Sequence, residues 1–200
     1  NSCLQTGAVL FGQMVVAVPA AWAFAKFHFR GKKILYTLYI VLMLMPFQVT
    51  MVSSYLVLNK LGLIDTVWAV ILPGAASTLP VFIMTRFFMD IPEAVMEAAA
   101  VDGASSFQTF LRFGLPLGAP GILSAVVLGF LEYWNAIEAP QAFLKNQALW
   151  PLSLYMSNIT ADNAGVSLIA SLITLMPPLL IFLSGQKYLE QGIISSGMKD

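Results

Sequence analysis

Few side chains in this 200-residue chain are of the kinds that make or break covalent bonds. His28 is the single histidine and Cys3 the single cysteine, and no partner residue stands near His28 at the spacing of a catalytic triad or a metal site. His28 lies instead among Lys26, Arg30 and Lys32, where we expect it to belong to a basic anchor. We therefore expect no catalytic residue, no metal site and no enzyme activity in the chain itself.

The segment Asp90–Pro116 has the composition of a surface that binds another protein. It holds four acidic residues and one basic residue, a net charge of −3 between two long apolar runs. A face of small side chains follows from Ala94, Ala98 and Val101, which recur at helical spacing. An acidic knob with such a face suits a groove on a soluble partner, and a second interpretation is a surface connector without a partner. The charged residues are Asp90, Glu93, Glu97, Asp102 and Arg112.

Local signals in this segment predict two short helices. Asp90 and Pro92 suit a helix start, and the run EAVMEAAAV that follows consists of strong helix formers. Gly103 can take the left-handed conformation that ends a helix, and Ser105 with Gln108 has the form of a capping box. We expect the second helix to end at Leu115–Pro116. Its apolar face would consist of Phe107, Phe110, Leu111 and Phe113.

A second group of polar side chains is expected inside the membrane. Glu132 lies about 20 Å along a helix from Gly118, and a carboxylate at that depth should face the bundle or a wet cavity. With Trp134 and Asn135 it forms a candidate substrate path, in which the ring could stack on a pyranose and the amide could bind a diol. The other interpretation is a structural hydrogen bond to a neighbouring span. Glu138 is expected nearer the outer surface and solvated, and weaker candidates near the outer half of their span are Gln48, Thr50, Ser53 and Ser54.

The elements that must position these groups are membrane helices. Hydrophobic residues make up 58% of the chain and charged residues only 10%, which is typical of an integral membrane protein. We predict an all-α, polytopic transmembrane helix bundle in a single domain, residues 1–200. Charge-free runs long enough to cross a bilayer, the fourth of them Phe113–Leu131, indicate five spans. We place these at about 7–25, 34–58, 66–85, 116–138 and 164–186, followed by a tail at 187–200.

Prolines fall in or near several of these runs. Each removes a backbone donor and is expected to bend or interrupt its helix. The sharper interpretation is a bundle whose broken helices line a pathway, and the plainer one is the general abundance of proline in membrane helices. The step Asp65–Thr66 suits the start of the third span. The prolines are Pro19, Pro46, Pro73, Pro80, Pro177 and Pro178.

The basic residues predict the orientation. Eight lie in the first connection, the third connection and the tail, and only Lys60 and Lys145 lie in the second and fourth connections. The positive-inside rule therefore places the segment Asp90–Pro116 and the C-terminus in the cytoplasm, and the N-terminus outside. Because the chain starts at Asn1, we expect a fragment that lacks its first helix, with six spans in the full length. The eight are Lys26, Arg30, Lys32, Lys33, Arg86, Arg112, Lys187 and Lys199.

The run Glu97-Ala98-Ala99, three residues, Gly103, nine residues, Phe113, one residue, Leu115-Pro116 resembles the EAA motif of ABC importer permeases. Phe113 stands where that motif usually has Ile. The likeness to the carbohydrate-importer, maltose-type branch extends over almost the whole chain, through NSCLQTGAVL, AAWAFAKFHFRGKK, MLMPFQ, the WN pair at Trp134–Asn135 and GIISSGMKD.

This resemblance implies that residues 90–116 are a coupling loop that sits in a cleft of a separate ATPase subunit. The implied ATPase-coupling interface is Glu93, Glu97, Ala98, Ala99, Asp102, Gly103, Leu115 and Pro116. The tail Gly192–Asp200 could also touch the ATPase. No P-loop motif occurs in the chain, so ATP and Mg²⁺ would be bound by the ATPase dimer and this chain would bind no cofactor.

The implied partners are the ATPase dimer, a second permease subunit in a heterodimer, an extracytoplasmic solute-binding protein and membrane lipid, with no nucleic acid. The expected function is import of a sugar or related solute across a bacterial inner membrane. An alternative is a secondary transporter driven by an ion gradient, which would use Glu132 and need no docking segment. An intramembrane enzyme is disfavoured because paired catalytic residues are absent from the sequence, and we expect no glycosylation at Asn158–Thr160.

Overall fold

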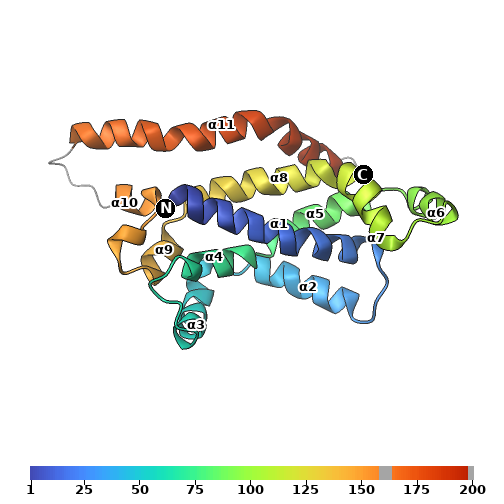
Figure 1. Ribbon diagram of the computed structural model, residues 1–200, viewed down its shortest axis with the longest axis horizontal. Helices are drawn as coiled ribbons and strands as arrows, with labels where there is room; N and C mark the ends of the chain where they lie inside the picture. The colour runs from blue at the N-terminus through green and yellow to red at the C-terminus, as the bar shows by residue number, and fades with distance from the viewer. Residues whose placement is uncertain (158–163, 198–200) are drawn as a thin grey trace. The chain divides into compact units, whose positions relative to one another are not determined.

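The computed structural model describes residues 1–157 and 164–197, and every regular element in that part of the chain is helical (Figure 1). This confirms the all-α prediction. The sequon Asn158–Thr160 and the last three residues of the predicted tail lie outside the described residues. The elements are α1 Ser2–Lys26, α2 Lys32–Met43, α3 Phe47–Lys60, α4 Trp68–Ala75, α5 Leu79–Met89, α6 Glu93–Val101, α7 Ser106–Thr109, the π-helical turn η1 Phe110–Gly114, α8 Leu115–Trp134, α9 Glu138–Phe143, the 3₁₀ turn η2 Gln147–Leu149, α10 Leu152–Ser157 and α11 Ala164–Gly197.

Four helical stretches within the described residues are long and apolar enough to cross a membrane. They are Ser2–Lys26, Trp68–Met89, Ser106–Trp134 and Leu168–Glu190. A fifth span is present if the bent pair α2 and α3 is counted as one, since these helices meet at 105°. The predicted span at 34–58 is therefore broken. Pro46 is the N-cap of α3, as expected for a residue that cannot continue the preceding helix.

Other prolines do not interrupt their helices. Pro19 lies inside α1, and Pro177 and Pro178 lie inside the 34-residue α11, which runs past them. Proline at position 178 removes the N–H that would donate to the carbonyl of Thr174 in a regular helix. The indole N–H of Trp134 donates to that carbonyl oxygen at 3.1 Å. A side chain from α8 thus replaces the backbone donor that α11 lacks.

Two helix ends differ from the sequence prediction. The fourth predicted span was placed at 116–138, but α8 ends at Trp134. The Asn135 side chain donates to the carbonyl oxygen of Leu131 at 2.8 Å, and such a bond competes with the regular helix ladder. The tail predicted from residue 187 instead continues α11 to Gly197, because QKYLEQ contains mostly good helix formers.

The described residues form two compact units. Unit 1 comprises Asn1–Gln13, Leu44–Ser77 and the described part of Val127–Ser184, and unit 2 comprises Met14–Met43, Thr78–Val126 and the described part of Gly185–Asp200. Helices α1, α8 and α11 each contribute residues to both units. The single-domain assignment stays a prediction.

The core of unit 2 is built from aromatic rings packed on α1, α5 and α8. Trp22 lies edge-on to Phe88, with ring centroids 5.3 Å apart. Gly114 faces Trp22, and Gly118 faces Phe88, at distances that leave no space for a side chain on either glycine. Close packing of this kind through small residues is the usual way in which membrane helices associate.

Unit 1 is organised by the connection between α3 and α4. Asp65 has a left-handed backbone, with φ 62°, and its Oδ1 accepts hydrogen bonds from the backbone N–H groups of Lys145 at 2.8 Å and Asn146 at 2.7 Å. Its own N–H donates to the carbonyl oxygen of Phe143. The expectation that Asp65–Thr66 starts a span is wrong, because α4 begins at Trp68 with Val67 as its N-cap. Asp65 instead joins two connections that are 80 residues apart in sequence.

The Trp134 bond can be tested with a pair of substitutions. We expect Trp134→Phe to lower the free energy of unfolding by about 1–2 kcal/mol, because the Thr174 carbonyl loses its donor. In a Pro178→Ala background the helix supplies its own N–H, and the cost of Trp134→Phe should fall below about half of that value. Thermal unfolding of the four purified proteins in one detergent measures the coupling. Equal costs in both backgrounds would show that the indole N–H does not compensate for the proline.

A second prediction concerns Asp65. We expect Asp65→Ala to release the amides of Lys145 and Asn146, so that their hydrogen exchange quickens at least tenfold, because two bonds to a charged acceptor are lost. Lys145→Ala is the matched control, since only the backbone of Lys145 takes part in the contact. Hydrogen exchange followed by mass spectrometry measures both variants. Unchanged protection of residues 144–146 in Asp65→Ala would contradict the prediction.

Candidate functional site

The segment between α5 and α8 folds locally as the sequence predicts. Gly103 takes φ 78° in the turn after α6, where a glycine has no side chain to strain. Ser105 caps α7: its hydroxyl accepts from the N–H of Gln108, and the Gln108 side chain accepts from the N–H of Ser105 at 2.8 Å. The predicted glycine turn and capping box are confirmed. We call Glu93–Thr109 the α6–α7 segment.

The expectation that Leu115–Pro116 ends the second helix is wrong. The chain runs from α7 through the π-helical turn η1 into α8, so Ser106–Trp134 is one long helical stretch. In η1 the N–H of Leu115 donates to the carbonyl oxygen of Phe110, five residues back. The hydrogen bond in η1 spans five residues instead of four, and Pro116 has no N–H that needs an acceptor. Pro116 can therefore lie inside a continuous helix. Leu115 and Pro116 therefore lie in the first turn of α8 and join the α6–α7 segment directly to a span.

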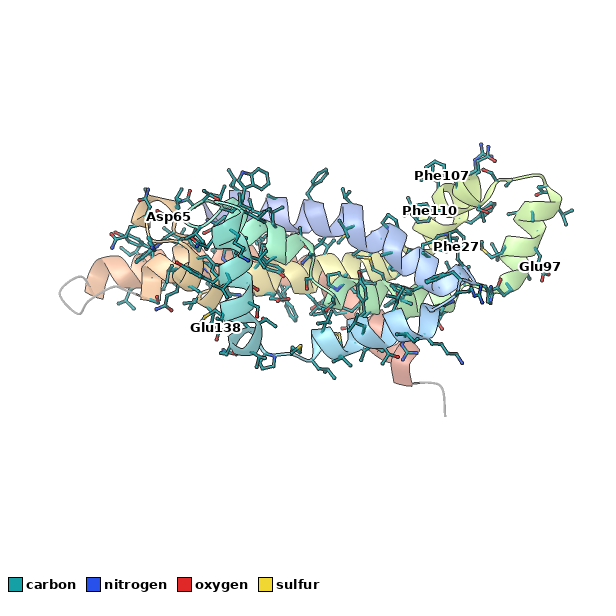
Figure 2. All side chains as sticks on the ribbon, turned by 90° about the horizontal axis from the view of Figure 1, so that it is seen from below. Phe27, Asp65, Glu97, Phe107, Phe110 and Glu138 are labelled. Carbon is teal, nitrogen blue, oxygen red and sulfur yellow. The ribbon has the colours of Figure 1, made fainter. Side chains whose placement is uncertain are left out.

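Four of the eight residues assigned to the coupling interface are exposed at the tip of the segment. Glu97, Ala98, Asp102 and Gly103 are exposed. Figure 2 shows Glu97 on α6, beside the adjoining helix that bears Phe107 and Phe110. Ala99 differs, since only 2% of it is exposed. Its carbonyl oxygen accepts from the N–H of Ala104, so Ala99 stabilises the turn and does not present a side chain to a partner.

Two apolar side chains at this tip add to the residues assigned to the ATPase-coupling interface, and one of them, Val101, belongs to the small-residue face that the sequence predicts. Val101 is 87% exposed and Phe107 is 68% exposed, on either side of the Gly103 turn. The expected apolar face of α7 is therefore only partly buried: Phe110 packs on the core of unit 2, whereas Phe107 does not. Exposed apolar groups that lie among carboxylates are typical of a surface that binds another protein. The signal was present in the sequence, but periodicity alone assigned Phe107 to the buried side.

Lys26 is a further residue at this site that the sequence did not single out. It ends α1, and only 3% of its side chain is exposed. Its Nζ donates to the carbonyl oxygen of Ile91 at 2.6 Å and lies 3.3 Å from Oε1 of Glu93. Sequence reasoning placed Lys26 in a basic anchor, because no local pattern joins residue 26 to residue 91.

The two contacts of Lys26 differ in strength. A hydrogen bond from a charged donor contributes about 1.5–3 kcal/mol. An ion pair at an exposed carboxylate contributes about 0–1 kcal/mol, and 70% of the Glu93 side chain is exposed. The bond to the Ile91 carbonyl is therefore the stronger of the two. Glu93 is held at the base of α6 and is not free at the tip.

The polar group Glu132, Trp134 and Asn135 does not converge on one point. Glu132 and Asn135 are exposed on the same side of the end of α8, three residues apart. Trp134 is buried, stacks on Phe130 with centroids 5.4 Å apart, and uses its N–H in the bond to α11. The geometry gives Trp134 a structural contact and leaves Glu132 and Asn135 as the polar pair of this group.

The weaker polar candidates lie apart from this group. Gln48 on α3 donates to Oε1 of Glu138, the first residue of α9, at 2.7 Å. Glu138 is labelled in Figure 2. Thr50 donates to the carbonyl oxygen of Phe47 in its own helix. A cavity of about 420 Å³ in unit 1 is bordered by Trp134 of that group, by Trp150 and Tyr155, and by polar groups such as Gln147. These residues offer aromatic and amide surfaces of the kinds that bind small polar solutes.

The sequence of this chain is similar to the sequences of known transport proteins. Residues 14–195 match the family model described as binding-protein-dependent transport system inner membrane component. The arabinooligosaccharides transport system permease protein AraQ of Halalkalibacterium halodurans is 27% identical over 96% of this chain and 68% of its own length. The sn-glycerol-3-phosphate transport system permease protein UgpE of Pectobacterium atrosepticum is 29% identical over 98% of this chain and 72% of its own length.

A solved structure agrees at the level of the fold. The crystal structure of a bacterial ABC transporter involved in import of the acidic polysaccharide alginate contains a chain that superposes with a TM-score of 0.80 at 22% identity. The superposition covers 94% of this chain and 72% of that one. The match of the family model over most of the sequence, together with the helical fold, shows that this chain belongs to the family of inner membrane components of binding-protein-dependent transport systems.

Proposed function

We propose that this chain is the permease subunit of an ATP-driven importer of sugars or related polar solutes, and that the α6–α7 segment docks into a separate ATPase subunit. The observation that carries the proposal is the tip at Gly103, where Glu97, Asp102, Val101 and Phe107 are all exposed while the base of the segment is packed. Such a tip can enter a groove, and its packed base can pass a displacement to the spans.

The solute class is supported by the relatives. AraQ is named for arabino-oligosaccharides and UgpE for sn-glycerol-3-phosphate, both of which are polar and carry hydroxyl groups. The exposed pair Glu132 and Asn135 can accept and donate hydrogen bonds to such groups. The binding protein would deliver the solute from outside, and ATP and Mg²⁺ would be held by the ATPase dimer.

A second permease subunit follows from the cost of exposing charge to lipid. Glu132 is exposed near the end of a predicted span, and none of the described residues donates a hydrogen bond to its carboxylate or pairs with it. Carboxylates in membrane segments face a bundle interior or a water-filled path. A partner permease that packs against this side of α8 would enclose Glu132 and Asn135 in a shared path. The heterodimer is proposed on that basis.

The orientation is proposed from the basic residues. Eight lie in or flank the first and third predicted connections and the tail, against two in the others. This distribution favours a cytoplasmic location for the α6–α7 segment and the C-terminus, and an outer location for Asn1. An ATPase in the cytoplasm would then reach the exposed tip, while the solute-binding protein would meet the opposite side.

An ion-gradient-driven transporter is the alternative that Glu132 supports, because such transporters use intramembrane carboxylates as proton or ion sites. The alternative leaves the exposed tip of the α6–α7 segment without a role. The two functions differ in one measurable requirement. Transport that depends on ATP and on the ATPase subunit supports the importer, whereas transport by this chain alone along an ion gradient supports the alternative.

The docking role predicts the effect of two substitutions at the tip. In proteoliposomes that contain the ATPase, both permeases and the binding protein, we expect Glu97→Lys and Gly103→Pro to lower solute uptake at least tenfold. The first reverses a charge on the docking face, and the second is incompatible with φ 78° at that turn. Membrane insertion should be unchanged, as measured by the yield of the chain in purified membranes.

Lys60→Glu is the matched control, since it reverses a charge on an exposed residue at the end of α3. This variant should retain uptake within about twofold, as surface charges far from a contact have small effects. Uptake at the parent rate in both Glu97→Lys and Gly103→Pro would remove the docking role of the tip.

The substrate path predicts a different phenotype. We expect Glu132→Ala and Asn135→Ala to weaken transport at least fivefold while ATP hydrolysis by the assembled complex continues, because the solute loses hydrogen-bond partners. Glu132→Gln keeps a polar group and should lose less. Radiolabelled solute uptake and phosphate release, measured on the same vesicles, separate the two activities. Parent-level uptake in both alanine variants would return these residues to a structural role.

A further inference from the structure

The last turn of α1 holds the α6–α7 segment at both ends. Trp22 and Lys26 are four residues apart and therefore lie on one face of α1. Lys26 contacts the chain just before α6 and in its first residue, and Trp22 contacts the chain just after α7. All of these residues belong to unit 2. Figure 1 shows the C-terminal end of α1 beside α7 and the start of α8.

The contact before α6 is a buried hydrogen bond. Nζ of Lys26 donates to the carbonyl oxygen of Ile91 at 2.6 Å, and Ile91 itself is buried in the core of unit 2. The ammonium also lies 3.3 Å from the Glu93 carboxylate. An ammonium with 3% of its side chain exposed is stable only when its donors are satisfied, so its position depends on this short link between α5 and α6.

The contact after α7 is an aromatic one. The rings of Trp22 and Phe110 have centroids 5.4 Å apart, and a Cβ on Gly114 would lie 2.8 Å from the Trp22 ring. The buried indole N–H of Trp22 has no acceptor within the described part of the chain. Trp22 therefore acts through the area and shape of its ring, which closes against the π-helical turn.

Through these contacts the α6–α7 segment could act on α1 as well as on its neighbours in sequence. The chain itself joins the α6–α7 segment only to α5 and α8, which are its neighbours in sequence. Displacing the segment without α1 would break the buried bond to Ile91 and separate the Trp22 and Phe110 rings. Packed interfaces of this kind move as a unit rather than deform continuously.

We propose that Trp22 and Lys26 are positioning residues through which displacement of the α6–α7 segment by the ATPase is passed to α1. This inference rests on the proposed function, because it requires a partner that moves the segment. It makes α1 a moving part of the transport cycle, joined to the coupling segment by side chains alone. Of the two contacts of Lys26, the bond to the Ile91 carbonyl carries the larger share, since Glu93 is exposed and its pairing is screened by water.

The first test measures solute molecules imported per ATP hydrolysed in the complete reconstituted complex. We expect Lys26→Met to lower this ratio at least fivefold, because the buried cationic donor is lost from a side chain of similar length. Lys26→Arg keeps the donor and should restore the ratio to within twofold of the parent. Glu93→Gln should lower the ratio less than Lys26→Met does. Trp22→Phe should lower it less than Trp22→Ala, since the ring and not its N–H makes the contact.

Lys33→Met is the matched control, because Lys33 is an exposed member of the same basic group and the substitution removes the same charge. A parent-like ratio in Lys33→Met with a low ratio in Lys26→Met supports the proposal. An unchanged ratio in Lys26→Met, or an equal fall in Lys33→Met, overturns it.

The second test follows the motion itself and does not depend on the Lys26 variants being stable. In a Cys3→Ser background, spin labels at Phe27→Cys, directly after α1, and Ala100→Cys, in α6, report the distance between the two parts. We expect this distance to stay constant when ATP is added to the parent complex, while a label pair between α6 and the ATPase confirms that nucleotide closes the complex. A change in the Phe27–Ala100 distance in the parent overturns the inference and leaves the docking role intact. Failure of the parent chain to retain any ATPase overturns both.

Discussion

Within a hydrocarbon layer every backbone N–H and C=O group must find its partner inside the protein, because no water is present to supply one. A regular helix satisfies this requirement with its own backbone hydrogen bonds. A proline or a helix break leaves some backbone groups without a partner in that helix. Several long-range contacts in this chain meet that need. Trp134 donates to the Thr174 carbonyl that Pro178 leaves without a donor. Gln13 donates to the carbonyl oxygen of Gly74 just before α4 ends, in addition to the N–H of Ser77. The irregular points of the helices are therefore also points of contact between helices.

The same principle extends to the segments outside the spans. Lys26 donates to the carbonyl oxygen of Ile91 between α5 and α6, and Asp65 accepts two N–H groups in the connection that follows α9. In each case one charged side chain satisfies backbone groups of a distant connection and fixes its course. A connection held in this way can pass a displacement to a helix. An unpaired loop would absorb the displacement.

This arrangement is consistent with a protein that transports without doing chemistry on its solute. In the importer proposed above, an event at the ATPase would have to change access to the solute path. The exposed tip at Gly103 and the packed base around Trp22 are suited to opposite parts of that task. The tip keeps its carboxylates and apolar groups available to a partner, and the base joins the tip to α1, α5 and α8.

The sequence by itself determined the helical membrane fold, the glycine turn at Gly103, the Ser105 cap and the family, because these depend on composition and on residues within one or two turns of each other. Tertiary structure alone decided which members of a local pattern are exposed. Ala99 is buried, Phe107 is exposed, and Trp134 is buried and bonded to α11, whereas Glu132 of the same predicted group is exposed. It also decided the roles of Lys26 and Asp65, which depend on residues 65 and 80 positions away. Helical periodicity gives the direction of a side chain relative to its own helix, and only the packed chain shows what lies in that direction.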